Sequence, residues 1–383
     1  MTDSNTMEKI LDPVSVDLLK AELTPEKKLC DTNKAGNEIY VVDALDAPNV
    51  LLEIGRLREI SFRDSGGGTG MSVDLDEFDT TQDRPYKQIV VWDPEACAII
   101  GGYRYILGPD IKMQEDGQPH ITSAHMFRYS DKFISEYLPH VMELGRSFVT
   151  PEYQSSKAGA KAIFALDNLW DGIAAVVFQH PNIMYLIGKM TIYPSYDASC
   201  RELIQHFLWK HFPDPDELAR PKYPVEPEVD GRLLDLILKD DEFKPDYRNL
   251  KDAVRRLGSN IPPLVNSYMS ISPTMKMLGT GINDEFFDAY DTGIMFCFDE
   301  IYEDKKERHK GPYFRHLAGK VLKRFPSIAP EAEELAAKLS AIRESRRVQQ
   351  LNKFLDDQKR QVAEAEKRLR LKLRRGKKEK VEP

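Results

Sequence analysis

The chain has 383 residues, of which 41% are hydrophobic and 30% are charged, with a formal net charge of −8. A chain of this length and composition can bury one large core or two ordinary ones. No run of eighteen or more apolar residues is apparent and the N-terminus lacks a signal-peptide pattern, so we expect neither a membrane-spanning helix nor secretion. The four cysteines are Cys30, Cys97, Cys200 and Cys297. Their wide spacing argues against a zinc site or disulfide framework and favours a reducing cytoplasm.

The charge is distributed unevenly along the chain. The segment "EKRLRLKLRRGKKEK", Glu366–Lys380, is strongly basic, so the remainder is more acidic than the total suggests. We expect residues 311–383 to form a charged, basic-ended helical tail that is either solvated or lies on an anionic membrane, where each basic residue contributes about 1 kcal/mol. The acidic body lacks interleaved aromatic and basic residues, so no nucleic-acid partner is expected.

The first third of the chain predicts a helix followed by a hairpin. Residues 1–44 form an N-terminal extension with a short helix and the strand "EIYVVDAL". "NVLLEIGRLREISFR" predicts an amphipathic helix capped by Asn49. The glycine-rich "RDSGGGTGMSVDLDEFD" lacks the ending of a phosphate-binding P-loop, and we interpret it as a mobile loop, one version of which is a substrate lid. "KQIVVWDPEACAIIGGYRYIL" predicts a β-hairpin.

The rest of the domain alternates strands and helices. "VMELGRSFVTPEYQ" predicts a strand, followed by a long apolar helix over about 156–179, the buried strand "IMYLIGKMTIYP" and the helix "DASCRELIQHFLWKHF". Residues 213–245 are proline-rich and acidic, and we interpret them as an insertion at the surface. A closing strand pair precedes the tail. This order predicts an α+β fold over residues 45–310, with a mixed sheet and helices on both faces.

Two charged residues, Glu143 and Arg146, lie inside an otherwise apolar strand. Burying a charge is costly unless the charge is paired or used. Strand alternation places Glu143, Gly145 and Ser147 on one face and Met142, Leu144, Arg146 and Phe148 on the other. We therefore expect Glu143 and Arg146 to face opposite sides of the sheet.

An ordered series of segments resembles a known family. The series is "RLREISF", "DLDEFD", "GGYRYIL", "MELGRSFVTPEYQ", "YLIGKMTIYPSY", "IPPLVNSYMSI" and "FDAYDTGIMFCF". It resembles the acyl-carrier-protein-dependent N-acyltransferases of ornithine and glycine lipid synthesis. These enzymes are GNAT-superfamily members, often described as hemolysin-like, and are similar to acyl-homoserine-lactone synthases. The resemblance implies a GNAT-like, mostly antiparallel sheet.

The resemblance also implies an activity. A fatty acyl chain, 3-hydroxylated in the family, would pass from acyl-carrier protein to the α-amine of a small amino acid, giving a lyso-aminolipid. Glycine and ornithine are the leading acceptors, and nothing in the sequence chooses between them.

The residues that the resemblance places around the active site come from four segments. They are Arg56 or Arg58 with Phe62, then Asp76 and Asp79, then Arg104, and finally Glu143 with Arg146. At Gly145 the chain departs from the related synthases, which have serine, so a contact from that hydroxyl is missing. We expect the absent side chain to let a pantetheine arm approach the backbone, and Arg146 to pair with Asp76 or Asp79.

The chemistry assigns a role to Glu143. Acylation requires a neutral amine to attack a thioester carbonyl, so a carboxylate that removes a proton helps. We expect Glu143, partly desolvated, to be this general base; the alternative is a buried ion pair with Arg104 or Arg146. No covalent enzyme intermediate is needed.

Two further groups would assist the transfer. Backbone N–H groups at the end of the strand, at Phe148 and Val149, would hold the negative charge that develops on the thioester oxygen. Tyr196, or alternatively Tyr193, would return a proton to the leaving thiolate. Ordinary packing is the competing interpretation for both tyrosines.

The segment "QSSKAGAK" bears on the acyl donor. GNAT enzymes that use CoA usually carry Arg/Gln-x-x-Gly-x-Gly/Ala here, whereas this chain has Gly159 five residues after Gln154 and no second glycine. The helix start at Ser155, Ser156 and Lys157 suits a single phosphate, which is what a carrier-protein phosphopantetheine offers. We therefore favour acyl-carrier protein over CoA as donor. Candidates for a basic surface that docks this acidic partner are Lys157, Lys161, Lys189 and Arg201.

Other interpretations remain open. We expect no permanently bound cofactor, and no metal because the histidines lack ligand spacing. One alternative function is a CoA-dependent acyltransferase acting on another amine. Another is a non-catalytic lipid-binding or membrane-active protein. The expected location is cytoplasmic, with possible peripheral contact to the inner face of the membrane through the tail.

Overall fold

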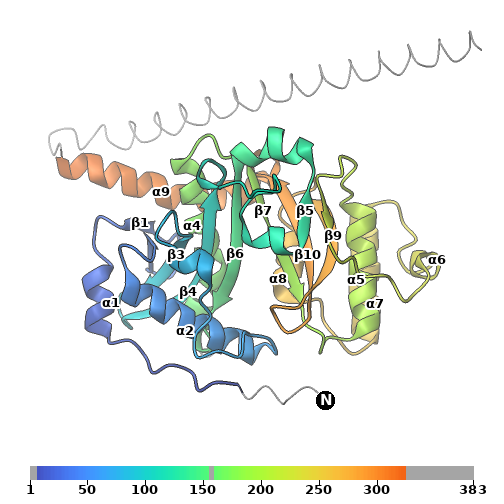
Figure 1. Ribbon diagram of the computed structural model, residues 1–383, viewed down its shortest axis with the longest axis horizontal. Helices are drawn as coiled ribbons and strands as arrows, with labels where there is room; N and C mark the ends of the chain where they lie inside the picture. The colour runs from blue at the N-terminus through green and yellow to red at the C-terminus, as the bar shows by residue number, and fades with distance from the viewer. Residues whose placement is uncertain (1–6, 155–158, 325–383) are drawn as a thin grey trace, which may run out of the picture.

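The computed structural model describes residues 7–154 and 159–324 (Figure 1). Its strands are β1 (Lys28–Asp31), β2 (Glu38–Val42), β3 (Lys87–Asp93), β4 (Ala98–Leu107), β5 (Phe127–Tyr129), β6 (Val141–Val149), β7 (Tyr185–Ile192), β8 (Ala219–Pro221), β9 (Lys276–Asn283) and β10 (Ala289–Cys297). Its α-helices are α1 (Val16–Glu22), α2 (Pro48–Asp64), α3 (Glu77–Thr80), α4 (Ala160–Gln179), α5 (Ala198–His211), α6 (Gly231–Asp235), α7 (Phe243–Arg256), α8 (Pro263–Met269) and α9 (Glu303–Arg324).

Eight strands form one sheet in the order β1-β2-β3-β4-β6-β7-β10-β9. Every neighbouring pair is antiparallel except β6 and β7, which are parallel and joined through α4. A crossover helix is the usual way to connect parallel neighbours, and a buried apolar helix is what the sequence predicts there. The mixed, mostly antiparallel sheet is therefore confirmed, as is the predicted hairpin of β3 and β4.

Helices cover both faces of the sheet, as predicted. The buried residues of α4, α5 and α8 belong to the largest core, on one face. On the other face, α2 packs over β2–β4 in a core that includes Ile54 and Phe148. A small sheet of β5 and β8 covers the rest of that face in a core with Phe127 and Met295. Figure 1 shows α1 and α2 at one end of the sheet and α5–α7 at the other.

The start of α2 differs from the prediction. The helix begins at Pro48, and its N-cap is Ala47 rather than Asn49, with no side-chain cap of its own. The carboxylate of Glu22 accepts hydrogen bonds from the backbone N–H of Asn49 and, at 2.8 Å, from that of Val50. A negative charge at a helix N-terminus is favourable. The cap comes from α1, so local sequence could not reveal it.

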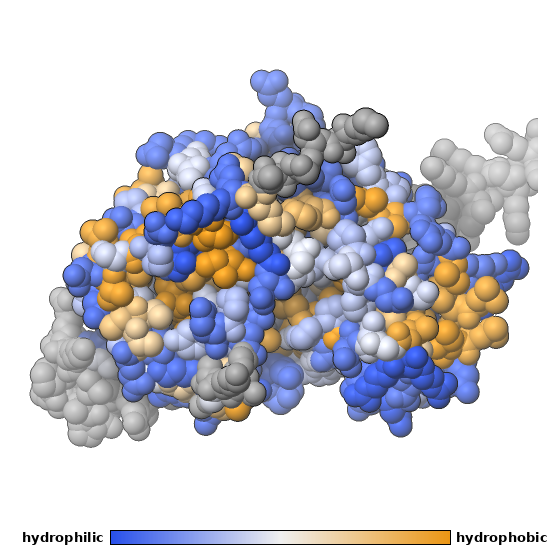
Figure 2. All heavy atoms as spheres, turned by 90° about the horizontal axis from the view of Figure 1, so that it is seen from below, coloured by the Kyte–Doolittle hydropathy of each residue, from blue (hydrophilic) through white to orange (hydrophobic). Residues whose placement is uncertain are grey.

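Three segments that the sequence predicted as separate from the main domain contain elements that belong to it in the structure. Within 1–44, β1 and β2 form one edge of the main sheet. Within 213–245, β8 pairs with β5 and Leu218 and Leu238 are buried, although Leu236 is 74% exposed. The right-hand end of Figure 2, where α5–α7 lie in Figure 1, carries an apolar patch. Helix α9 begins before 311 and buries Tyr313, whereas residues 325–383 of the predicted tail lie outside the described residues.

One helix has the length and composition of a membrane span. In α4, Lys161–Gln179 is long and apolar enough to cross a membrane by length and composition, with a mean hydropathy of 1.2. However, 61% of this window is buried inside the protein, where α4 packs on the sheet. A helix that is mostly buried in this way is typical of a protein core.

Candidate active site

Strands β6 and β7 separate partway along their length. They pair at Val141–Tyr185, Met142–Leu186 and Glu143–Ile187, and no pairing continues beyond Glu143 although both strands do. The sheet therefore opens between the C-terminal halves of two adjacent parallel strands, which leaves backbone groups on facing edges without ladder partners.

A β-bulge in β6 lies at this opening. Opposite β4, the register shifts between the pairs Gly102–Phe148 and Arg104–Gly145, so that Arg146 and Ser147 together face one residue. Arg146 has φ +49°, a left-handed conformation that is uncommon for residues other than glycine. A bulge adds one residue to the strand and resets the alternation of its side chains.

The bulge makes the predicted alternation wrong beyond Gly145. Arg146 contacts Asp74, on the side of the sheet that Glu143 also faces, whereas Ser147 is hydrogen-bonded to Tyr103 in the core beneath α4. Glu143 and Arg146 therefore lie on the same face instead of on opposite faces.

A cleft of about 540 Å³ occupies the opening. On the α2 side its lining combines charged residues with aromatic ones such as Phe62 and Phe148, and on the α4 side it is mainly apolar. The charged lining includes Asp76, Arg104, Glu143, Arg146 and Lys189, and the apolar lining includes Leu144, Val149, Pro262, Pro263, Leu264 and Tyr268. Because residues from both faces of the sheet line it, the cleft passes between β6 and β7 from one face to the other.

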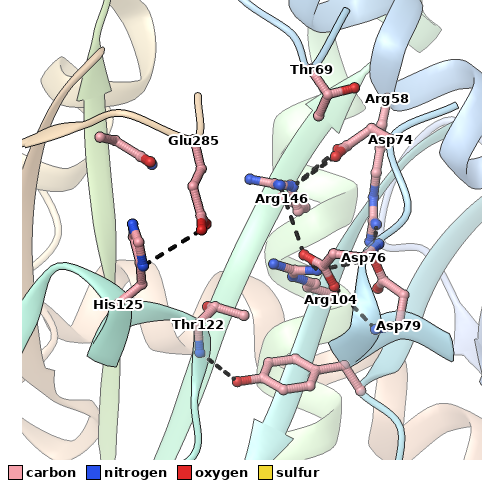
Figure 3. A network of polar contacts seen from close by, with 12 residues as sticks. Arg58, Thr69, Asp74, Asp76, Asp79, Arg104, Thr122, His125, Arg146 and Glu285 are labelled. Atoms are coloured by element: carbon pink, nitrogen blue, oxygen red, sulfur yellow. Dashed lines mark hydrogen bonds and ion pairs between the residues drawn. The ribbon is translucent and has the colours of Figure 1, made fainter. Parts of the chain in front are cut away.

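Three arginines and three aspartates form a network at the charged end (Figure 3). The pairs are Arg58 with Asp79 at 3.0 Å, Arg104 with Asp76 at 2.6 Å and with Asp79 at 2.9 Å, and Arg146 with Asp74 at 3.0 Å. One sequence prediction is thereby corrected: Arg146 pairs mainly with Asp74 rather than with Asp76 or Asp79, and its distance to Asp76 is 3.8 Å. Six charges that balance in number can be buried together because each has a partner.

Burial and the neighbouring arginines shift the pKa of Asp79 in opposite directions. Burial raises the pKa of its carboxyl, but the nearby guanidinium groups of Arg58, Arg104 and Arg146 outweigh burial and lower the pKa to about 2. For Asp74 the balance is reversed, because burial raises its pKa despite Arg146 and Arg58. Asp76 is the most accessible of the three aspartates, with 30% of its side chain exposed.

The glycine-rich segment before Asp74 is tied to α2. The carboxylate of Glu59 accepts from the backbone N–H and the hydroxyl of Thr69, at 2.9 and 2.8 Å, and from Gly70 N–H at 2.8 Å. Arg63 donates to the carbonyl of Met71 at 2.6 Å. These bonds do not support the interpretation as a mobile loop. The segment instead forms a fixed wall that carries Asp74 and Asp76.

Glu143 is almost fully buried and accepts four hydrogen bonds. Oε1 accepts from the N–H of Ser123, at 2.8 Å, and from its hydroxyl, while Oε2 accepts from the Tyr86 hydroxyl and, at 3.3 Å, from Thr122 N–H. A carboxylate offers about four lone-pair sites. A substrate N–H can therefore reach Glu143 only where one donor moves aside, and the two hydroxyls are the donors that can rotate.

The alternative role for Glu143, a buried ion pair, is not what the structure shows. Among the described residues no arginine pairs with it, since Arg104 and Arg146 use their guanidinium groups on aspartates. Glu143 instead holds Thr122 and Ser123, in the 3₁₀ turn Thr122–His125, against β6.

Both candidate tyrosines line the cleft. The Tyr196 hydroxyl donates to the carbonyl of Asn260 at 2.9 Å. Burial raises the pKa of Tyr196 and of Tyr193 to about 12, so each hydroxyl is protonated at neutral pH and is able to donate a proton or hydrogen bond. The structure brings both near the opening and does not by itself choose between them.

The remaining predicted residues fall into three groups. Phe62, Gly145, Phe148 and Val149 line the cleft, whereas Arg56 does not and is paired with Glu53 at 2.6 Å. Ser155, Ser156 and Lys157 lie outside the described residues. The predicted docking cations Lys161 and Lys189 are paired with Asp93 and Asp291, and Arg201 is buried against Tyr290, so these three do not form an exposed basic patch.

Sequence reasoning missed several residues of the site. Tyr86, Thr122 and Ser123 surround Glu143, and Phe286, from the turn between β9 and β10, packs edge-on against Phe62 with ring centroids 5.4 Å apart. These residues come from turns and loops far from β6 in sequence, and no motif spacing connects them. Within 7–154 and 159–324, no group of three or more His, Cys, Asp or Glu residues is arranged to hold a metal ion.

Comparison with known proteins relates this chain to acyltransferases. The family described as "Acetyltransferase (GNAT) domain" matches residues 57–163, which include the bulged strand. Two curated proteins named glycine N(alpha)-acyltransferase, from Phocaeicola vulgatus and Bacteroides thetaiotaomicron, are each 55% identical to this chain over 303 residues. These alignments cover 79% of this chain and 93% and 90% of the two relatives. A solved structure of the CoA-dependent acyl-homoserine lactone synthase BjaI with MTA is similar over 72% of this chain and 88% of its own, with 11% identity and a TM-score of 0.30.

A mostly antiparallel sheet that opens between two parallel strands, with a bulge and a cleft at the opening, defines a GNAT-type N-acyltransferase. The extent of the identity to the two curated relatives makes the assignment specific: the chain belongs to the glycine N(alpha)-acyltransferase family. It is accordingly an acyltransferase.

Proposed function

We propose that this enzyme transfers a long, 3-hydroxylated acyl chain from acyl-carrier protein to the α-amine of glycine. The observation that carries the proposal is the cleft between β6 and β7, which is apolar at one end and charged at the other. An acyl thioester entering on the apolar side and a small zwitterion on the charged side would meet at the opening. The names of the two curated relatives support glycine over ornithine as acceptor.

The proposed reaction needs no covalent enzyme intermediate. The neutral amine nitrogen attacks the thioester carbonyl, a C–N bond forms, the C–S bond breaks, and the thiolate leaves. Glu143 would take the amine proton, directly or through the hydroxyl of Ser123 or Tyr86, and Tyr196 would give a proton to the thiolate. Backbone N–H groups near the bulge, towards Phe148, would stabilise the oxygen as it becomes negative.

A carrier protein remains the proposed donor. The support is the segment "QSSKAGAK", which has one glycine where CoA-binding relatives of the fold usually have two. With such a donor, the product would be an acylated glycine, a lyso-aminolipid, that partitions into a bilayer. A cytoplasmic enzyme that touches the inner face of the membrane through residues 325–383 is consistent with this product, and is part of the proposal.

Thiol release by the purified full chain tests the proposal. We would compare 3-hydroxypalmitoyl-carrier protein with the matching CoA thioester, each with glycine, ornithine, serine or no acceptor. Release that requires both the carrier-protein donor and glycine is the expected result. Preference for ornithine would change the acceptor, and turnover only with CoA would change the donor. Absence of release from folded enzyme with every pair would reject acyl transfer to these amines.

A further inference from the structure

Gly145 lines the charged end of the cleft and leaves a small space beside its Cα. A Cβ built on this glycine would lie 3.4 Å from Arg104 Nε, 3.6 Å from Arg104 Cγ and 3.9 Å from Thr122 Oγ1. These are ordinary van der Waals contacts, and Gly145 does not have a positive φ. Neither the backbone nor packing therefore requires glycine here. The space beside Gly145 is bounded instead by two polar groups that a ligand could use.

Arg104 has an unused donor beside this space. Its Nη1 donates to Asp76 at 2.6 Å and to Asp79 at 2.9 Å, whereas its Nε–H is buried without a partner among the described residues. The side chain is 2% exposed and lines the cleft. A buried guanidinium N–H that lacks an acceptor is unfavourable, and a carboxylate oxygen is the acceptor that matches it best.

Thr122 supplies the second group. Its backbone N–H is engaged by Glu143 and by the Tyr86 hydroxyl, which fixes the residue, and its side chain lines the cleft. The Thr122 hydroxyl, like Arg104 Nε, therefore lies within 4 Å of the Cβ position of Gly145. Two donors beside one small space suit a carboxylate, which has two oxygens that accept hydrogen bonds.

We propose that the space beside Gly145 is the seat of the acceptor's α-carboxylate, which accepts hydrogen bonds from Arg104 Nε and Thr122 Oγ1. This inference rests on the proposed function, in which the acceptor is glycine. With its carboxylate held there, glycine presents its amine towards Glu143 and the opening between β6 and β7. The sequence-based expectation that a pantetheine arm fills this space is the competing assignment. It accounts less well for Arg104, because a neutral arm would leave Nε without a charged acceptor.

Filling the space tests the assignment. In Gly145→Ala, the new methyl group occupies the seat, and its contacts of 3.4–3.9 Å are ordinary ones that the fold can accommodate. We expect the KM for glycine to rise by about ten-fold or more while the KM for the acyl donor stays within about two-fold, the effect of losing a charge-assisted hydrogen bond. Thr122→Val, which keeps the shape and removes the hydroxyl, should also raise the KM for glycine. Gly319→Ala in α9, where a Cβ meets nothing within 4 Å, is the matched control.

Two further measurements separate this inference from the proposed function. Calorimetric titration with glycine alone reports binding without turnover. Glycinamide, which lacks the carboxylate, should be a poor acceptor for the natural enzyme. Its acylation rate should fall little further in Gly145→Ala, because it has no carboxylate to lose from the seat. A rise in donor KM with unchanged glycine KM and affinity in both variants would overturn the carboxylate seat and leave the proposed function standing. Failure of the natural enzyme both to bind and to acylate glycine would instead overturn the proposed function and, with it, this assignment.

Discussion

Arg146 Nε lies 3.0 Å from Oδ2 of Asp74, a contact that joins the bulge of β6 to the segment that follows α2. The same guanidinium lies 5.0 Å from the ring centre of Phe286, in the turn between β9 and β10. One side chain on a strained backbone, with φ +49°, thus connects three segments that are remote in sequence. Such strain persists where the surrounding structure holds the residue in place.

Replacing Arg146 should therefore destabilise the protein. Arg146→Met leaves Asp74 buried without its closest cation, and we expect a loss of roughly 3 kcal/mol in the free energy of unfolding, measured by urea titration. Arg232→Met removes an arginine from an exposed pair with Asp230 and should leave the free energy of unfolding nearly unchanged. Equal stability of the two variants would show that the Arg146–Asp74 pair does not hold the bulge.

Glu143→Gln should abolish most turnover. The amide cannot accept the amine proton, so we expect kcat to fall by about 10²–10⁴. Because the amide also places N–H groups where Glu143 accepts four hydrogen bonds, the measurement needs circular dichroism and a melting curve beside the thiol-release assay. A folded variant that retains the kcat of the natural enzyme would assign Glu143 a purely structural role, and Asp76→Asn would then be the next variant to assay.

The two tyrosines can be told apart by paired substitutions. If Tyr196 protonates the leaving thiolate, Tyr196→Phe should lower kcat by about ten-fold or more with little change in either KM, and Tyr193→Phe should have the smaller effect. Both hydroxyls have a pKa raised to about 12, so neither should produce a limb in the pH–rate profile near neutrality. The reverse order of effects on kcat would transfer the role to Tyr193.

Asp79 should make the stability of the protein depend on pH in the acidic range. Its pKa is lowered from 3.8 to about 2, so the folded state releases a proton more readily than the unfolded state. The resulting stabilisation, roughly 2 kcal/mol, is present above about pH 4 and is lost as the pH falls towards 2. The difference in unfolding free energy between the natural protein and Asp79→Asn should shrink over this interval.

The control for this pH effect is Asp12→Asn, which alters an exposed pair with Lys9. Its difference from the natural protein should stay close to zero at every pH. A constant difference for Asp79→Asn between pH 4 and 2 would mean that Asp79 is not held charged by the three arginines.

The order of the elements, the class of the fold and the segments that carry charge could all be predicted from the amino-acid sequence. Helical spacing identified α2 and the apolar helix α4, and alternation identified the hairpin of β3 and β4, because these patterns arise from contacts between near neighbours along the chain. Glu143, Arg104 and the aspartates around position 76 could be named as site residues from the resemblance, although the sequence could not say which of them pair.

The geometry on which the chemistry depends arises only from contacts between segments of the folded chain. The bulge at Arg146 is set by the register of β6 against β4, and it places Arg146 on the face of Glu143, where strict alternation put it opposite. The donors to Glu143 come from Tyr86 and the turn at Thr122 and Ser123, and Glu22 caps α2 from another helix. Each of these contacts joins residues distant along the chain. Local propensity carries no information about them, since they form only when the sheet brings those segments together.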